Sequence, residues 1–186
     1  MKKLFTVLFF TVSSIVFSQS TWKADKAHSK VSFNITHLMI SEVTGNFGDF
    51  NIEATADDTF SNPNFNVEIK IASIDTDNDG RDKHLRSDDY FGAEKFPTMV
   101  FKTTNVEMTG EKTFKLTGDL TIKDVTRSVT LDGKVNGIIT NRRNQKLKAG
   151  LKITGTIDRL LFKVGGKTAT LGDEVEIVIN MEMNQQ

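Results

Sequence analysis

The chain has 186 residues, with 24 basic and 24 acidic side chains, 14 phenylalanines and no cysteine. This length fits one domain, and a mean hydropathy of −0.28 is too polar for a protein with several membrane spans. Zero net charge argues against nucleic-acid binding, which needs a surplus of cations. Without cysteine the chain has no disulfides, thiolate metal sites or cysteine nucleophile.

The N-terminal segment has the layout of a secretory signal peptide. A cationic start precedes an apolar run that ends at Phe17, and small residues follow at Ser18 and Ser20. The run is too short and too rich in serine and threonine for a good membrane span. We therefore predict a signal peptide over 1–18, cleaved near Ser18, and an exported domain over 19–186 without a membrane span. We expect a periplasmic or secreted location.

Beyond residue 20, apolar and polar residues alternate with the period of 2 that is typical of half-buried β-strands. The phase changes at Gly48-Asp49, which indicates a bulge or a bend. Eight consecutive strands with one apolar face predict an all-β domain, either an up-and-down barrel or a sandwich. We expect the strands at about 31–35, 43–54, 67–71, 99–106, 114–122, 129–135, 147–157 and 175–181.

Residues 77–97 interrupt the strand pattern between the third and the fourth strand. Asp79 is expected to cap a short helix from about Gly80 to Ser87, with Leu85 pointing inward. The preceding acidic stretch begins like a calcium loop, but Arg86 takes the place of the bidentate glutamate. We interpret it as an acidic turn.

No familiar motif for catalysis or metal binding occurs in the chain. The three histidines His28, His37 and His84 lack metal-ligand spacing, so we predict no metal site. Phosphate loops, nucleophile elbows and dinucleotide fingerprints are also missing, so we predict no catalytic residue, no cofactor and no enzyme. An acid/base pair between His84 and neighbouring aspartates such as Asp82 or Asp89 stays open.

Several short motifs, in this order and spacing, resemble the YceI-like family of periplasmic, lipocalin-like proteins that bind polyisoprenoid lipids. The resemblance covers almost the whole chain after the signal peptide. One departure is Arg159-Leu160-Leu161-Phe162-Lys163, where the family has arginine, two polar residues, phenylalanine and glycine. The motifs are Trp22-x-x-Asp25-x-x-His28-Ser29-x-x-x-Phe33, His37-Leu38, Val43-x-Gly45-x-Phe47, Ser73-Ile74-Asp75-Thr76, Arg81-Asp82-x-His84-Leu85-x-Ser87-x-Asp89-Tyr90-Phe91, Phe96-Pro97, Gly118-x-Leu120-Thr121-Ile122-Lys123-x-Val125-Thr126 and Leu171-Gly172-Asp173-x-Val175.

The resemblance implies an eight-stranded antiparallel up-and-down lipocalin-like β-barrel, with a short helix between strands 3 and 4. It also implies an apolar lumen that holds a polyisoprenoid or another long-chain amphiphilic lipid without catalysis. Candidate contacts for the lipid head group are His28, His37, Arg81 and His84. From the alternation of the strands, the lumen candidates are Val31, Phe33, Ile35, Phe47, Val67, Ile69, Phe101, Leu116, Leu120, Leu131, Leu151, Ile153, Ile177 and Ile179.

Two other functions stay open at this point. One is a hydrolase or isomerase that acts on a lipid head group at the barrel mouth, which needs His84, Asp82 and Asp89 clustered there. The other is a solid structural or stress-response barrel whose interior is filled by side chains. The sequence also leaves the oligomeric state open, a dimer included.

Overall fold

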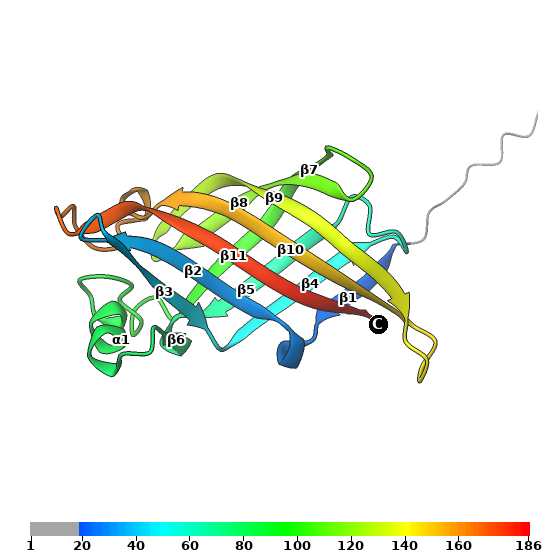
Figure 1. Cartoon of the computed structure of the whole chain (residues 1–186), viewed down its shortest axis with the longest axis horizontal. Coiled ribbons are helices and arrows are strands. Elements are labelled where there is room, and N and C mark those ends of the chain that lie inside the picture. The colour runs from blue at the N-terminus through cyan, green and yellow to red at the C-terminus, as the bar shows by residue number, and fades with distance from the viewer. Residues whose placement is uncertain (1–18) are drawn as a thin grey trace, which may run out of the picture.

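The structure is a computed structural model that describes residues 19–186, so the signal-peptide prediction for 1–18 lies outside it. Its strands form one antiparallel sheet that curls and closes, because β1 pairs with both β4 and β11 (Figure 1). When β1 with β2, β3 with β4 and β5 with β6 are each counted as one long strand with a break, every long strand pairs with its neighbours in the chain and the last pairs with the first. This confirms the predicted eight-stranded up-and-down barrel.

The sheet has more strands than the eight of the barrel, because three of the barrel's long strands are each divided in two by a break. The strands are β1 (Ser20–Ala24), β2 (Lys30–His37), β3 (Ser41–Phe47), β4 (Phe50–Ala56), β5 (Asn64–Lys70), β6 (Ile74–Asp75), β7 (Thr98–Met108), β8 (Thr113–Ile122), β9 (Val125–Thr140), β10 (Leu147–Asp158) and β11 (Leu171–Gln185). The helices are α1 (Asp79–Arg86) and the short 3₁₀ turns η1 (Lys26–His28), η2 (Ile71–Ser73) and η3 (Arg159–Phe162).

Each break changes the direction of one long strand. Strands β1 and β2 flank η1 and pair with different parts of β11. Strands β3 and β4 flank the bend at Gly48-Asp49, where the change of phase in the sequence indicated a bulge or a bend. The parts of a strand on either side of such a break pair with the same neighbouring strands, so the sheet continues across it.

Two local features differ from the expectation. Strand β1 escaped prediction because its five residues are too few for a clear alternation, yet its Trp22 is fully buried. The residue that caps α1 is Asn78 and not Asp79. The side-chain oxygen of Asn78 accepts the Arg81 N–H at 2.9 Å, and Asp79 is already the first helical residue.

The interior at the end of the barrel where β1 lies is filled by side chains. The indole of Trp22 packs edge-on against Phe60, with ring centroids 5.0 Å apart, and donates its N–H to the Ala56 carbonyl at 3.3 Å. Phe65 and Met183 are buried in the same core. Helix α1 lies at the opposite end, beside β3 and β6 (Figure 1). The barrel therefore has one packed end and one end that the helix flanks.

Candidate functional site

The barrel interior between these two ends holds an apolar cavity of about 390 Å³. This volume lies within the range of small-molecule sites in proteins. Its walls are inward-facing side chains of β2 to β5 and β7 to β11, and α1 contributes residues at one end. Because the cavity is open space among apolar side chains, the barrel is not solid, and its interior can accept a hydrocarbon chain.

All predicted lumen residues except Leu151 line this cavity. Leu151 is instead buried in the packed core, where it pairs with Met181 and Val135 at a register shift in β10. The alternation identifies which residues of a strand point inward. It does not show how far along the barrel the interior is filled, and Leu151 lies in the filled part.

Three of the four proposed head-group residues lie at the mouth of the cavity: His37, Arg81 and His84. The Arg81 guanidinium is held in place by Thr76, since its Nε donates to Oγ1 at 2.7 Å and its Nη2 to the carbonyl at 2.6 Å. The ring of His84 stands edge-on to Tyr90, with centroids 4.9 Å apart. These groups form a polar rim around an apolar interior.

His28 is the exception, and the structure does not place it at the cavity. It lies just before the start of β2, whereas His37 is the last residue of that strand at the mouth, so nearly the whole length of β2 separates the two histidines. The His28 ring contacts Asp25 at 3.0 Å. In the same cluster, the Lys148 ammonium lies 2.7 Å from Glu182 and 3.3 Å from Asp25. Lys148 thus compensates the two carboxylates, and the cluster is an ion-pair network.

The carboxylates proposed for an acid/base site do not converge at the mouth. Asp82 is buried and accepts the backbone N–H of Thr76 at 3.0 Å, on the inner side of α1. Asp89 does approach His84, with 3.6 Å between Oδ2 and Nε2, but both side chains are largely exposed. The structure therefore brings together one exposed pair and not the three-residue cluster that the enzymatic alternative needs.

Sequence reasoning missed Arg159 as a part of the mouth. Its buried guanidinium donates to the carbonyls of Gly172 at 2.8 Å, Val164 at 2.9 Å and Gly166 at 3.1 Å. These bonds hold the loop between η3 and β11, which supplies Thr168 and Thr170 to the cavity wall. The available signal was an arginine directly after a barrel strand, followed by two glycines.

Residues 159–163, where the sequence departs from the expected motif, form η3 and the residue that ends it. Phe162 is buried as a core residue, while Leu161 faces outward. Lys163 occupies the position of the family's glycine with φ of 57°, in the left-handed region that glycine adopts most easily. Lys163 therefore adopts a backbone conformation that is less favourable for lysine than for glycine.

Within residues 19–186, no helix combines the length and the apolar character that a membrane crossing needs. The chain is similar to a UPF0312 protein of Staphylococcus aureus strain bovine RF122 / ET3-1, with 40% identity over 86% of this chain and 95% of that protein. Among solved structures, a Campylobacter jejuni YCEI protein is 32% identical with a TM-score of 0.74, and covers 97% of this chain and 99% of its own.

More distant structures share the fold. BcnA of Burkholderia cenocepacia is 24% identical with a TM-score of 0.77, over 86% of this chain and 98% of its own. A polyisoprenoid binding domain from Saccharophagus degradans is 11% identical with a TM-score of 0.67, over 89% and 98%. The model of the YceI-like domain matches residues 22–183, almost the whole barrel. With its motifs, its fold and its relatives in agreement, this chain belongs to the YceI-like family.

Proposed function

We propose that this protein binds a polyisoprenoid or a similar long-chain lipid inside the barrel and holds it without catalysis. The observation that carries the proposal is the apolar cavity of about 390 Å³ with a polar rim at one end. The structural neighbour from Saccharophagus degradans, a polyisoprenoid binding domain, supports this choice of ligand class.

The two ends of the barrel set the direction of the lipid. The end near Trp22 and Met183 is filled by side chains, so a chain enters from the other end. There His37, Arg81 and His84 line the mouth and can face a polar head group. The tail therefore lies in the lumen and the head group stays at the rim.

The size of the cavity is compatible with useful affinity. The cavity of about 390 Å³ is lined almost entirely by apolar side chains, so each methylene of a tail that enters it leaves water for apolar surroundings. A micromolar complex needs about 8 kcal/mol, which about ten methylenes supply at the upper limit of about 0.8 kcal/mol each. Burial of the tail can therefore supply a large part of the binding energy, although drug-sized ligands gain only about 0.3 kcal/mol per heavy atom. Longer tails would extend through the mouth.

Extraction of the purified protein with an apolar solvent, followed by mass spectrometry, tests the proposal. We expect a prenyl lipid from the wild type and much less from Val67→Trp, because the indole would fill space beside the lumen-facing Val67. Glu68→Trp is the matched control, since Glu68 is the next residue of β5 and points outward. No prenyl lipid in the wild type, and no uptake of an added prenyl alcohol, would overturn the proposal.

We also propose that the domain is exported, with residues 1–18 as the signal peptide. The support is the cationic start, the short apolar run and the small residues near Ser18. Cell fractionation with N-terminal sequencing tests this. The mature protein should begin near Gln19 outside the cytoplasm, whereas an intact N-terminus in the cytoplasmic fraction would refute export.

A further inference from the structure

The turn between β2 and β3 carries a run of exposed apolar side chains. Leu38 is 48% exposed, Met39 80% and Ile40 85%. A single exposed apolar residue is ordinary on a protein surface, but consecutive ones at a protruding tip indicate a contact with another apolar phase.

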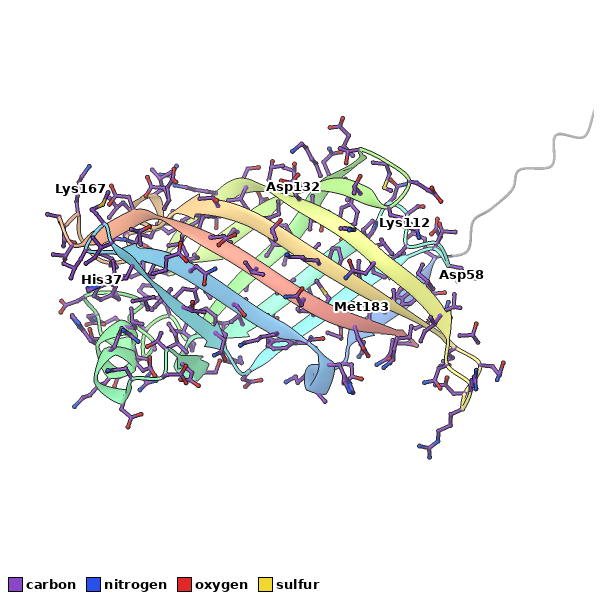
Figure 2. All side chains as sticks on the ribbon, viewed as in Figure 1. His37, Asp58, Lys112, Asp132, Lys167 and Met183 are labelled. Carbon is purple, nitrogen blue, oxygen red and sulfur yellow. The ribbon has the colours of Figure 1, made fainter. Side chains whose placement is uncertain are left out.

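This apolar tip, residues 38–40, lies beside the cavity mouth. It follows His37, which lines the cavity, and the Leu38 N–H donates to the carbonyl of Thr170, another lining residue, at 2.7 Å. Figure 2 shows His37 and Lys167 at the same end of the barrel, with Met183 and Asp58 toward the other. Any surface that contacts the tip is therefore next to the opening of the lumen.

The conformation of the turn does not explain these residues. Leu38 and Met39 have φ of 52° and 60°, and the Ile40 N–H donates to the His37 carbonyl at 3.2 Å. Positive φ at both central positions is the pattern of a type I′ turn, in which asparagine and glycine are favoured. Leucine and methionine make this turn harder to form, so their presence indicates a role outside folding.

The shape and the charges around the tip identify the partner. A stable protein interface buries about 800 Å² on each side, far more than three side chains on one narrow hairpin offer. The nearby cations Lys163 and Lys167 are paired with Asp124 and Asp173. The surface therefore suits insertion into the apolar part of a neutral bilayer rather than attraction to anionic lipids.

We propose that the apolar tip inserts into the membrane interface and places the mouth against the bilayer, so that a prenyl lipid passes into the lumen without crossing water. This inference rests on the proposed lipid binding. It adds a membrane-docking surface and a route for the ligand. The exposed Leu161 of η3, at the end of β10 near the mouth, can contact the same surface.

The test measures transfer of a fluorescent prenyl alcohol from phosphatidylcholine vesicles into the delipidated protein. In the double variant Leu38→Asn/Met39→Gly, the residues suit the turn, so the hairpin keeps its fold. We expect its transfer rate to fall at least about tenfold while its final occupancy stays at the wild-type level. The control Ile139→Ser removes an equally conspicuous side chain, 64% exposed near the far end of β9, and should transfer at the wild-type rate.

Four outcomes decide between explanations. A wild-type rate in the double variant, or an equal loss in Ile139→Ser, would overturn membrane docking while leaving lipid binding intact. Insertion of an apolar tip would also be overturned if transfer by the wild-type protein became much slower in about 1 M salt, where charges are screened beyond about 3 Å. If the wild type takes up no prenyl alcohol even from detergent, the proposed lipid binding itself fails.

Discussion

At the scale of single residues, barrel glycines make room for aromatic rings on the neighbouring strand. Gly133 and Phe114 face each other in the β8–β9 register, and a Cβ on Gly133 would overlap the Phe114 ring. Gly45 is covered by Phe33 in the same way. In sheets, an aromatic side chain laid over glycine compensates for the missing side chain. These glycines thus serve the packing of the wall.

Replacement of Gly133 by alanine should destabilise the barrel. The added methyl group would force the buried Phe114 ring out of place, and such overpacking costs about 1–3 kcal/mol. Gly137→Ala is the matched control in the same strand, because a Cβ there would meet no atom of residues 19–186 within 4 Å beyond its chain neighbours. Urea denaturation should give a lower midpoint for Gly133→Ala only. An equal loss in both variants would contradict the packing argument.

The ion-pair network at the far end predicts a dependence of stability on pH. A hydrogen bond from His28, supported by Lys148, holds the pKa of Asp25 below its usual value. Because the folded-state pKa is depressed, this stabilisation is present above the unfolded-state value of about 3.9 and is lost as the pH falls through the lower folded value. The hydrogen bond to Glu182 raises the pKa of Lys148, so its stabilisation is lost only as the pH rises through that raised value.

Asp25→Asn should therefore flatten the acid side of the stability profile. We expect the free energy of unfolding of the variant to fall less than that of the wild type as the pH is lowered from about 5 to about 2. The measurement is urea denaturation at each pH. Asp132→Asn breaks an exposed pair with Lys115 and serves as the control, because exposed pairs contribute little. A wild-type slope in Asp25→Asn would refute the assignment.

At the scale of elements, helix α1 depends on its first turn. Asn78 caps it through the bond to the Arg81 N–H, and Arg81 in turn reaches Thr76 and the mouth. The cap therefore stabilises both the helix and one side of the rim.

Asn78→Ala should destabilise the protein by about 1 kcal/mol, the usual loss for a helix cap. Asp79→Ala should destabilise the protein by only a few tenths of a kcal/mol, since Asp79 contributes mainly through its charge near the helix start. Thermal unfolding measures the total effect. Hydrogen exchange should show faster exchange in residues 79–86 for Asn78→Ala. If Asp79→Ala lost more stability than Asn78→Ala, then Asp79 rather than Asn78 would be the cap.

At the scale of the whole molecule, stability and occupancy of the lumen are linked. A ligand that binds only the folded barrel stabilises it by mass action, by about 2.7 kcal/mol at a concentration about 100 times its Kd. The cavity of about 390 Å³ is lined by buried residues from most of the strands, so filling it acts on the barrel as one unit.

Delipidated wild-type protein should therefore unfold at a lower temperature than protein resupplied with a prenyl alcohol. Val67→Trp, whose lumen is blocked, should show little or no such rise, while Glu68→Trp should behave as the wild type. Scanning calorimetry measures all three proteins. A rise of equal size in Val67→Trp would place the ligand outside the lumen.

The sequence by itself determined the all-β class through its alternation, the family and its barrel through its motifs, and part of the cavity wall. Val31, Phe33 and Ile35 show why, because a period of 2 in a one-sided strand dictates which side chains point inward. The bend at Gly48-Asp49 was predicted for the same reason, since a change of phase exchanges the inward and outward faces of the strand. Such patterns lie within one strand, so they can be recognised without knowing which strands pair with it.

Only the tertiary structure decided where along the barrel the interior is filled and which polar groups share an end. Leu151 and Leu131 follow the same alternation, yet one lies in packed core and the other on the cavity. His28 and His37 flank one strand, yet only His37 reaches the mouth. These differences depend on strand tilt, on the register shift in β10 and on the closure by β1. All three are long-range relations between strands, which the alternation within one strand does not record.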